Sequence, residues 1–166
     1  RLTMVSKMIC GVALLALLAG PPPLEAQGAQ VAFGSAVQDS DAPVEVTADD
    51  LSISQGDGTA EFAGDVTIRQ GAMRLAAPRV LVIYLPDQSG IERLHATGGV
   101  TLTSGDDAAE AAEARYNVVT GMIEMQGDVL LVRGPNALSA ARLFVDTRAG
   151  TARMSGQVKT VLQPGD

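Results

Sequence analysis

Few side chains in this 166-residue sequence could do acid–base chemistry, and they form no known catalytic arrangement. His95 is the one histidine, and it stands near Arg93 at a position of its segment that carries polar side chains. A catalytic base must lie within reach of a bound substrate. Because His95 lies among polar positions, we expect it to be a solvated surface residue. The sequence also holds no Gly-x-Ser-x-Gly nucleophile elbow, paired-histidine helix or phosphate-binding loop. We therefore predict a protein that is not an enzyme and needs no cofactor.

Two acidic pairs, Asp49-Asp50 and Asp106-Asp107, are the residues that could bind a cation. Calcium takes six to eight oxygen ligands from a loop in which those ligands have a defined spacing. Neither pair has such a spacing, so turn or surface positions are favoured for both. We predict no metal site.

The first residues have the pattern of an export signal. Lys7 gives a positive start, residues 8–19 form an apolar stretch, and residues 21–26 form a proline-rich end that closes on a small residue. We predict a signal peptide over residues 1–26, with cleavage after Ala26 or Ala29, and therefore a periplasmic protein. The apolar stretch is shorter than the roughly twenty residues of a membrane-spanning helix, but a retained amino-terminal anchor stays open as an alternative.

The exported chain is acidic and has no cysteine. The one cysteine, Cys10, lies in the predicted signal peptide, so no internal disulfide is expected. Loss of Arg1, Lys7 and Glu25 from the 12 basic and 19 acidic side chains leaves 10 and 18, a net charge of −8. Such a surface repels nucleic acid and anionic membranes, which excludes both as partners. Residues 27–43 are small, polar and aperiodic, and we interpret them as a flexible linker.

The most informative feature is an internal repeat. Its first unit has seven positions. The first is small or apolar, the third is glycine, the fifth is valine and the seventh is apolar, whereas the other three vary. The glycines are Gly64, Gly98, Gly127 and Gly156, spaced by 34, 29 and 29 residues. A second unit alternates with the first, over residues 48–53, 77–82, 113–118 and 140–145.

Within both units the apolar side chains recur at every second position, which is the period of a strand and not of a helix. We predict that they share one interior face, made of Leu51, Ile53, Phe62, Val66, Ile68, Val80, Val82, Tyr84, Val100, Leu102, Tyr116, Val118, Met125, Val129, Leu131, Leu143 and Val145. The same period adds Met154 and Val158. The interleaved positions are polar or small and belong to the outer face: Thr67, Arg69, Thr101, Thr103, Asn117 and Asp128.

These patterns predict an all-β fold, a β-jelly roll or V-shaped two-sheet β-solenoid of eight to twelve short antiparallel strands. The alanine-rich stretch 106–115 has helix-like composition, but its place in the repeat favours a strand. Aromatic residues make up only 3% of the sequence, so the interior must be aliphatic. Periodicity alone leaves open whether that interior is a filled core or a lined groove.

The order and spacing of these units resemble the LptA/OstA family of periplasmic lipopolysaccharide-transport proteins. The resemblance covers residues 44–150 and rests on an Ala-Asp-Leu strand, a Gly-x-Val strand, a Gln-Gly turn and a strand ending in tyrosine. In this sequence these motifs lie at residues 46–51, 60–71, 75–84, 91–100, 114–116 and 121–129. One departure is Ala77-Pro78-Arg79 where the family has Ala-Asp, which indicates a bulge or an exposed edge, because proline removes a ladder hydrogen bond.

The resemblance implies a jelly-roll domain over residues 44–163 that binds lipopolysaccharide through its lipid A acyl chains, with the 17 interior residues as lining. It also implies docking by edge-strand β-augmentation to an inner-membrane LptC-like protein and an outer-membrane LptD-like protein, and head-to-tail self-association. The candidate edges are residues 44–53 and 151–162. Two alternatives stay open: an LptC-like partner that keeps its membrane anchor, and a structural β-solenoid without a ligand.

Overall fold

The structure, a computed structural model, describes residues 30–33 and 41–164, which form strands and their connections. Eleven strands make one antiparallel sheet, and the described residues contain no helix. The strands are β1 (Gln30–Ala32), β2 (Glu45–Thr47), β3 (Asp50–Ser54), β4 (Thr59–Gln70), β5 (Met73–Tyr84), β6 (Ile91–Ser104), β7 (Asp107–Asn117), β8 (Met122–Arg133), β9 (Asn136–Asp146), β10 (Thr151–Ser155) and β11 (Lys159–Val161).

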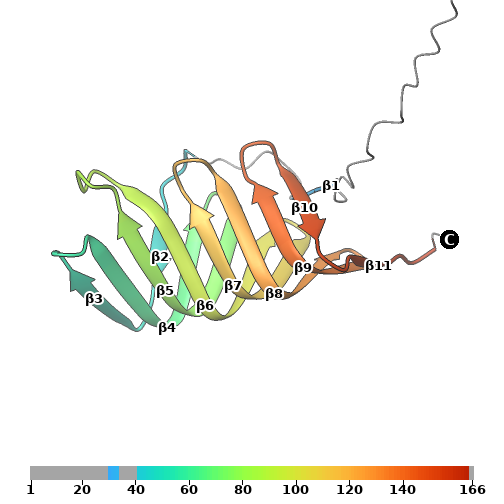
Figure 1. Cartoon of the computed structure of the whole chain (residues 1–166), viewed down its shortest axis with the longest axis horizontal. Helices are drawn as coiled ribbons and strands as arrows, with labels where there is room; N and C mark the ends of the chain where they lie inside the picture. Colours follow the sequence, from blue (N-terminus) through green and yellow to red (C-terminus); the bar gives the residue numbers. More distant parts are fainter. Residues whose placement is uncertain (1–29, 34–40, 165–166) are drawn as a thin grey trace, which may run out of the picture.

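Consecutive strands from β4 to β10 lie side by side, and the short strands complete the two ends (Figure 1). The sheet order is β1-β10-β9-β8-β7-β6-β5-β4-β2, with β3 also on β4 and β11 also on β9. β2 and β3 pair with opposite halves of β4, and β11 and β10 pair with opposite halves of β9. Each of these pairs therefore occupies the place of one long strand.

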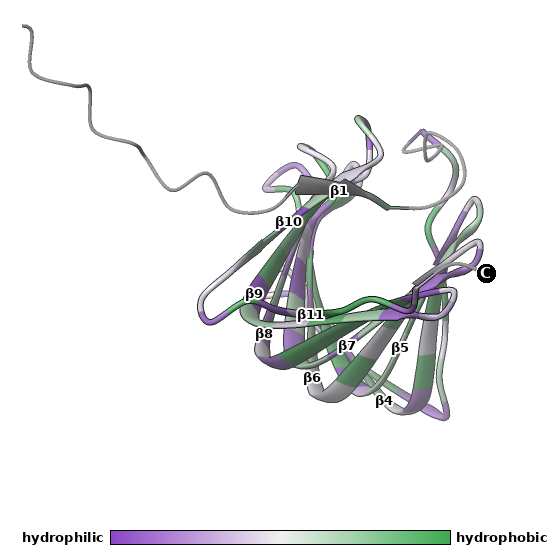
Figure 2. Cartoon of the chain, turned by 90° about the vertical axis from the view of Figure 1, so that its right-hand side faces the viewer, coloured by the Kyte–Doolittle hydropathy of each residue, from purple (hydrophilic) through white to green (hydrophobic). Residues whose placement is uncertain are grey.

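The long strands bend at one level. A repeat glycine lies at the bend in β4, β6 and β8, and Gly156 lies at the same level between β10 and β11. Gly64, Gly98, Gly127 and Gly156 have φ between 79° and 90°, and the residue after each also has positive φ. Two successive residues in this left-handed region turn a strand sharply, and the strand pairings shift register at this level. The sheet thus folds into two facing walls along one corner (Figure 2). We call the half paired with β3 and β10 the first wall, and the half paired with β2 and β11 the second wall.

Glycine is needed at this corner for space as well as for conformation. A Cβ at Gly127 would lie 2.5 Å from the Cβ of Ala112, and one at Gly156 would lie 2.7 Å from the Cβ of Ala141. A Cβ at Gly98 would lie 3.2 Å from Pro78. These three glycines therefore pack on a short side chain at the start of a second unit or, for Gly127, directly before one, which explains why the two units alternate. Pro78 lies inside the central strand β5 where the register shifts, so it marks a bulge and not an exposed edge.

The all-β fold is confirmed, as is the strand character of the alanine-rich stretch, which is β7. The expected short strands are wrong in length. β4 to β9 have 11 to 14 residues each, because the corner bends a strand without ending it.

The predicted linker is only partly described, and the described part includes a strand. Gln30–Ala32 forms β1 on the edge of β10, and Phe33 is buried, so this stretch is not linker. Residues 34–40 and the predicted signal peptide, residues 1–26, lie outside the described residues.

The corner makes a prediction about stability. Gly127→Ala should lower the free energy of unfolding by about 3 kcal/mol, because it adds both left-handed strain and a collision with Ala112. Gly134 is the matched control, since its φ is +54° but nothing lies within 4 Å of an added Cβ. Gly134→Ala should cost only about 1 kcal/mol. Urea unfolding of both variants measures the difference, and equal losses would show that corner packing is unimportant.

Candidate lipid-binding interior

The register of the sheet arranges apolar side chains into continuous rows on the inner face. Residues directly opposite each other in an antiparallel sheet project to the same side, so each row can be followed from strand to strand. The first wall carries two rows, Leu51, Phe62, Val80, Ala96, Ala114, Met125, Leu143 and Met154, and Ile53, Ala60, Val82, Leu94, Tyr116, Ile123, Val145 and Ala152. The second wall carries Val46, Ile68, Leu75, Leu102, Ala109, Leu131 and Leu138.

The structure buries most of the predicted interior residues. Twelve of the 17 are buried: Val66, Ile68, Val80, Val82, Val100, Leu102, Tyr116, Met125, Val129, Leu131, Leu143 and Val145. Phe62, Tyr84 and Val118 are half-buried and pack against the same cluster. Leu51 and Ile53 are exposed, but their register with Phe62 and Ala60 places them on the inner face. Met154 is buried, whereas Val158 is exposed between β10 and β11.

Sequence periodicity missed a second set of interior residues for one geometric reason. Buried positions keep the same parity through the corner in β4, β6 and β8, but in β5, β7 and β9 they shift by one residue. A two-residue period carried through the corner therefore loses the far half of those strands. The residues missed in this way are Met73, Leu75, Ala77, Ala109, Ala111, Leu138 and Ala140. Ala60, Leu94, Ala96, Ala114, Ile123 and Ala152 are also buried, and they keep the period although they were not assigned to the interior.

A hydrogen bond between Tyr116 and Gln70 joins the two walls across the mouth, the side opposite the corner. The Tyr116 hydroxyl donates to Oε1 of Gln70, and Nε2 of Gln70 donates to the carbonyl oxygen of Ala42. Tyr116 is in β7 and Gln70 in β4, with β5 and β6 between them. Strands are about 4.8 Å apart, so along the sheet these residues would be roughly 14 Å apart. The bond must therefore cross the space between the walls.

Polar side chains lie in the row of the second wall that is farthest from the corner, along the mouth. Gln70, Ser104 and Asp107 are buried there, and Arg133 Nε lies 3.5 Å from a carboxylate oxygen of Asp107. Burial raises the pKa of the Tyr116 hydroxyl above its ordinary value of 10.0, against the lowering effects of hydrogen bonds to Thr147 and Gln70 and of the Arg148 charge. The space between the walls, which we call the lumen, is thus filled by aliphatic side chains and has polar side chains along its mouth.

The two ends of the lumen differ in exposure. At the β3 end, Leu51 is 52% and Ile53 66% exposed. At the β10 end, Met154 and Ala152 close the same two rows and are 0% and 1% exposed. Both rows of the first wall are therefore exposed to solvent at the β3 end and buried at the β10 end.

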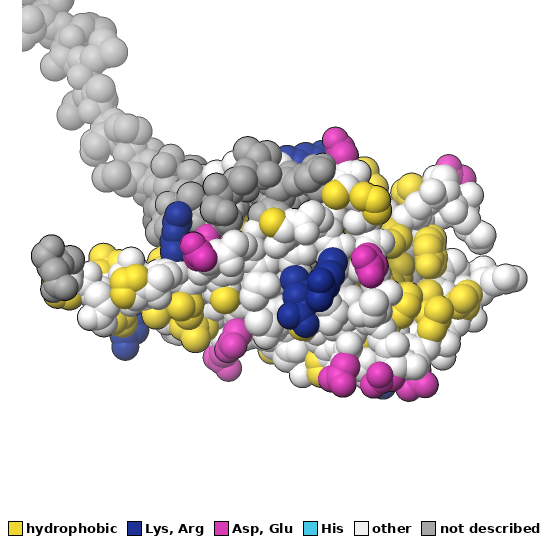
Figure 3. Space-filling model, turned by 180° about the vertical axis from the view of Figure 1, so that it is seen from behind, with side chains coloured by type: hydrophobic (Ala, Val, Ile, Leu, Met, Phe, Trp, Pro, Cys, Tyr) yellow, Lys and Arg dark blue, Asp and Glu magenta, His cyan; other side chains and the backbone are white. Residues whose placement is uncertain are grey.

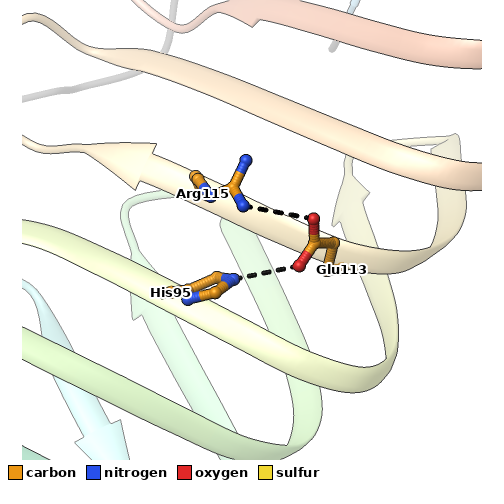
Figure 4. A network of polar contacts seen from close by, with 3 residues as sticks. All are labelled: His95, Glu113 and Arg115. Atoms are coloured by element: carbon orange, nitrogen blue, oxygen red, sulfur yellow. Dashed lines mark hydrogen bonds and ion pairs between the residues drawn. The ribbon is translucent and has the colours of Figure 1, made fainter.

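The outer face carries His95, the one candidate for acid–base chemistry, together with its polar neighbours. His95 Nε2 lies 3.1 Å from Oε2 of Glu113, and Arg115 binds the other oxygen of that carboxylate at 3.3 Å (Figure 4). These three side chains lie on neighbouring strands of a solvated face, which agrees with a surface role for His95. Surface hollows follow the convex side of the corner, beside Gly127 and Gly64, and are lined mainly by outward residues.

Two further features concern metal binding and membrane-spanning helices. Among the described residues, no three histidine, cysteine, aspartate or glutamate side chains gather as they would around a metal ion. In the same part of the chain, no helix has the length and hydrophobicity to cross a membrane.

Comparisons with known proteins agree with this architecture. The sequence profile of a family described as "LptA/(LptD N-terminal domain) LPS transport protein" matches residues 45–151. An uncharacterized protein of Rhizobium meliloti (strain 1021) is 27% identical over 136 residues, covering 75% of this chain and 73% of that protein. The crystal structure of LptH from Pseudomonas aeruginosa, described as the LptA-homologous periplasmic component of a lipopolysaccharide transport device, is similar with a TM-score of 0.68. It is 18% identical and covers 76% of this chain and 99% of its own.

The bond across the mouth predicts a pH-dependent stability. Tyr116→Phe should cost about 1 to 2 kcal/mol of unfolding free energy at neutral pH, because it removes a buried hydrogen bond. Since the folded pKa is raised, the unfolded chain ionises first, so the tyrosine's contribution is complete below pH 10 and falls as the pH rises above it. Thermal unfolding between pH 8 and pH 11 should show a shallower decline for Tyr116→Phe than for Tyr84→Phe. Parallel declines in the two variants would contradict this assignment.

Proposed function

The chain belongs to the family of LptA and LptD amino-terminal-domain proteins of lipopolysaccharide transport, and on that premise we propose that it carries lipopolysaccharide through the periplasm. In this proposal the lipid A acyl chains lie along the interior rows, while the saccharide stays in water outside the mouth. The family consists of transport proteins and not of enzymes, in keeping with a site made of apolar side chains.

The observation that carries the proposal is the unbroken inner face. Its rows run from β3 to β10 without a charged residue, and its residues are Val, Leu, Ile, Met and Ala with few rings. Exposure of an acyl chain of about twelve methylenes to water costs on the order of 10 kcal/mol, at roughly 0.8 kcal/mol per group. A continuous aliphatic surface removes that cost along the whole length of the protein.

Binding requires the two walls to part, because the middle of the lumen is closed. Val80, Leu102, Met125 and Leu143 are almost fully inaccessible to solvent. Parting the walls exposes these side chains, and an entering acyl chain covers them again, so the hydrophobic cost is offset by the ligand. The walls hinge at the corner, because separating them breaks only side-chain contacts across the mouth. The backbone hydrogen bonds between neighbouring strands stay intact.

The alanines of the interior support this mode of binding. Ala96, Ala109 and Ala114 lie in the rows among larger residues, and they leave shallow tracks when the walls separate. The exposed end at Leu51 and Ile53 offers the lowest-cost entry, since these side chains already face solvent. We propose that the lipid enters or leaves there.

Partners are proposed to add strands at the ends of the sheet. β2 and β3 form one end, and among the described residues no strand lies beyond them. Unpaired N–H and C=O groups at such an edge accept a strand of another protein. The inner-membrane LptC-like and outer-membrane LptD-like proteins are the partners that family membership favours.

A structural solenoid without ligand is the second candidate, and the closed middle of the lumen favours it. A lipid-capture experiment separates the two candidates. A small diazirine amino acid at Ile68, Val82 or Leu131 should cross-link lipopolysaccharide on irradiation, because these positions line the lumen. The same residue at Thr67 or Asn117 should not, because these positions lie on the other parity.

The pair Ile68 and Thr67 is the sharpest comparison, since the two positions are adjacent and differ only in face. Unfolding temperatures of all variants check that the probe is tolerated. Capture from neither face would favour the ligand-free solenoid, and capture from the outer face alone would overturn the proposed site.

The proposed domain limits are tested separately. We propose that residues 1–26 are removed on export and that the domain extends over residues 44–163, with β1 added to it. Mass spectrometry of periplasmic protein should then give an amino terminus near Gln27 or Gln30. An intact terminus in the membrane fraction would instead support the anchored LptC-like alternative.

A further inference from the structure

The amino-terminal strand β1 covers the edge of β10 at the far end of the chain. Gln30 pairs with Arg153, Val31 with Ala152 and Ala32 with Thr151, and the Phe33 N–H donates to the carbonyl oxygen of Gly150 at 3.0 Å. Phe33 is 1% exposed and belongs to the hydrophobic core cluster. This short segment therefore closes the end of the lumen at which Met154 and Ala152 are buried.

The register shows which residues β1 replaces. The row that starts at Ile53 in β3 ends at Ala152 in β10, and Val31 continues it. By the same rows Gln30 stands where Ser52 of a further copy would stand, and Ala32 where Ser54 would. β1 thus occupies the place that residues 52–54 of a second copy would take if the sheet continued from one molecule into the next.

The strand directions agree with this substitution. Neighbouring strands alternate in direction from β3 to β10, with six strands between them, so β3 of a copy stacked in the same orientation would run antiparallel to β10. β1 is also antiparallel to β10. The two strands therefore compete for the same hydrogen-bonding groups.

Charge distinguishes the native cap from a second copy. Residues 41–61, which form the β2 and β3 end, contain six acidic and no basic side chains. Residues 142–162, which form the β10 and β11 end, contain four basic side chains and one acidic. On the face shown in Figure 3, acidic side chains lie on both halves of the molecule, with a group along the lower edge on the right. Opposite ends of one molecule are therefore complementary, whereas Gln30, Val31 and Ala32 are uncharged.

We propose that β1 with Phe33 is a detachable cap, and that the acidic β2 and β3 edge of a second copy displaces it to extend the sheet head to tail. β3 has five residues to pair with the five of β10, against three in β1, and β2 can pair with β11. Arg153 would then lie opposite Ser52 and diagonal to Asp50, within reach of its long side chain. The inference rests on the edge docking of the proposed function and adds a gate to it.

The gate keeps the isolated molecule from assembling. β1 is tethered, so its effective concentration at β10 is on the order of millimolar. An incoming edge wins only when its longer ladder and its charge pairs outweigh that advantage. Because the charge pairs are near the surface, salt should weaken assembly.

Two variants of the full exported chain test the cap in opposite directions. Val31→Pro removes a backbone donor that, by the alternation from Phe33, faces β10. It should lower the concentration for head-to-tail assembly about tenfold, the equivalent of about 1.4 kcal/mol. The pair Ala32→Cys with Thr151→Cys lies at a position suited to a cross-strand disulfide and should hold the protein monomeric until the disulfide is reduced. Sedimentation velocity measures both effects.

Charge reversal tests whether β3 of a second copy is the strand that pairs with β10. In the Val31→Pro background, Arg153→Glu should weaken assembly, and Arg153→Glu mixed with Asp50→Arg should restore it. Arg93→Glu, an exposed arginine on the central strand β6, is the matched control and should leave assembly unchanged. Phe33→Ala provides a second way to loosen the cap should the proline variant fold poorly.

Equal assembly of the locked and reduced proteins would overturn the cap, as would an unchanged assembly concentration in both Val31→Pro and Phe33→Ala. Lipopolysaccharide cross-linking at Ile68 in the same proteins separates this outcome from the proposed function. Capture with ungated assembly overturns the cap alone, and gated assembly without capture overturns the carrier function alone.

Discussion

The structure depends on one backbone constraint, the pair of left-handed residues at each repeat glycine. Gly64, Gly98, Gly127 and Gly156 place this pair at one level of the sheet. A bend at different levels in different strands would break the ladder between them. Because all bends coincide, the hydrogen bonds persist on both sides of a straight corner, and two walls face each other. The single interior and its mouth both follow from this alignment.

Much of this architecture could be predicted from sequence because the repeat encodes it directly. The glycine spacing and the two-residue period gave the strands, and twelve predicted interior residues are buried. The corner also limited the prediction. Pro78, Ala112 and Ala141 lie where β5, β7 and β9 shift parity, so half of each of these strands fell out of phase with the period. Such a shift depends on how neighbouring strands bend together, which no single segment records.

Contacts between distant segments were the other part beyond sequence reasoning. Tyr116 and Gln70 are 46 residues apart and meet only because the walls fold over each other. β1 lies in a stretch without periodicity, and three residues with one following phenylalanine give too little pattern to predict a strand. Both features close openings that the repeat itself leaves. The repeat thus specifies the two walls, whereas Gln70 and β1, which lie outside the repeat units, help to cover the openings between them.

A carrier of acyl chains must reconcile a stable apolar interior with access to it. A permanently open groove would expose the Val, Leu and Met rows to water, whereas a close-packed core would exclude a ligand. Here the walls share a continuous backbone only along the corner, and side chains alone join them across the mouth. In the proposed function, opening exposes the rows without breaking the sheet, and the bound acyl chains supply the contacts that the walls lose. The same logic applies at the ends, where an exposed edge would promote uncontrolled association. In the proposed assembly, a cap that takes the place of three residues of the next molecule protects the basic end and yields to a longer strand of opposite charge.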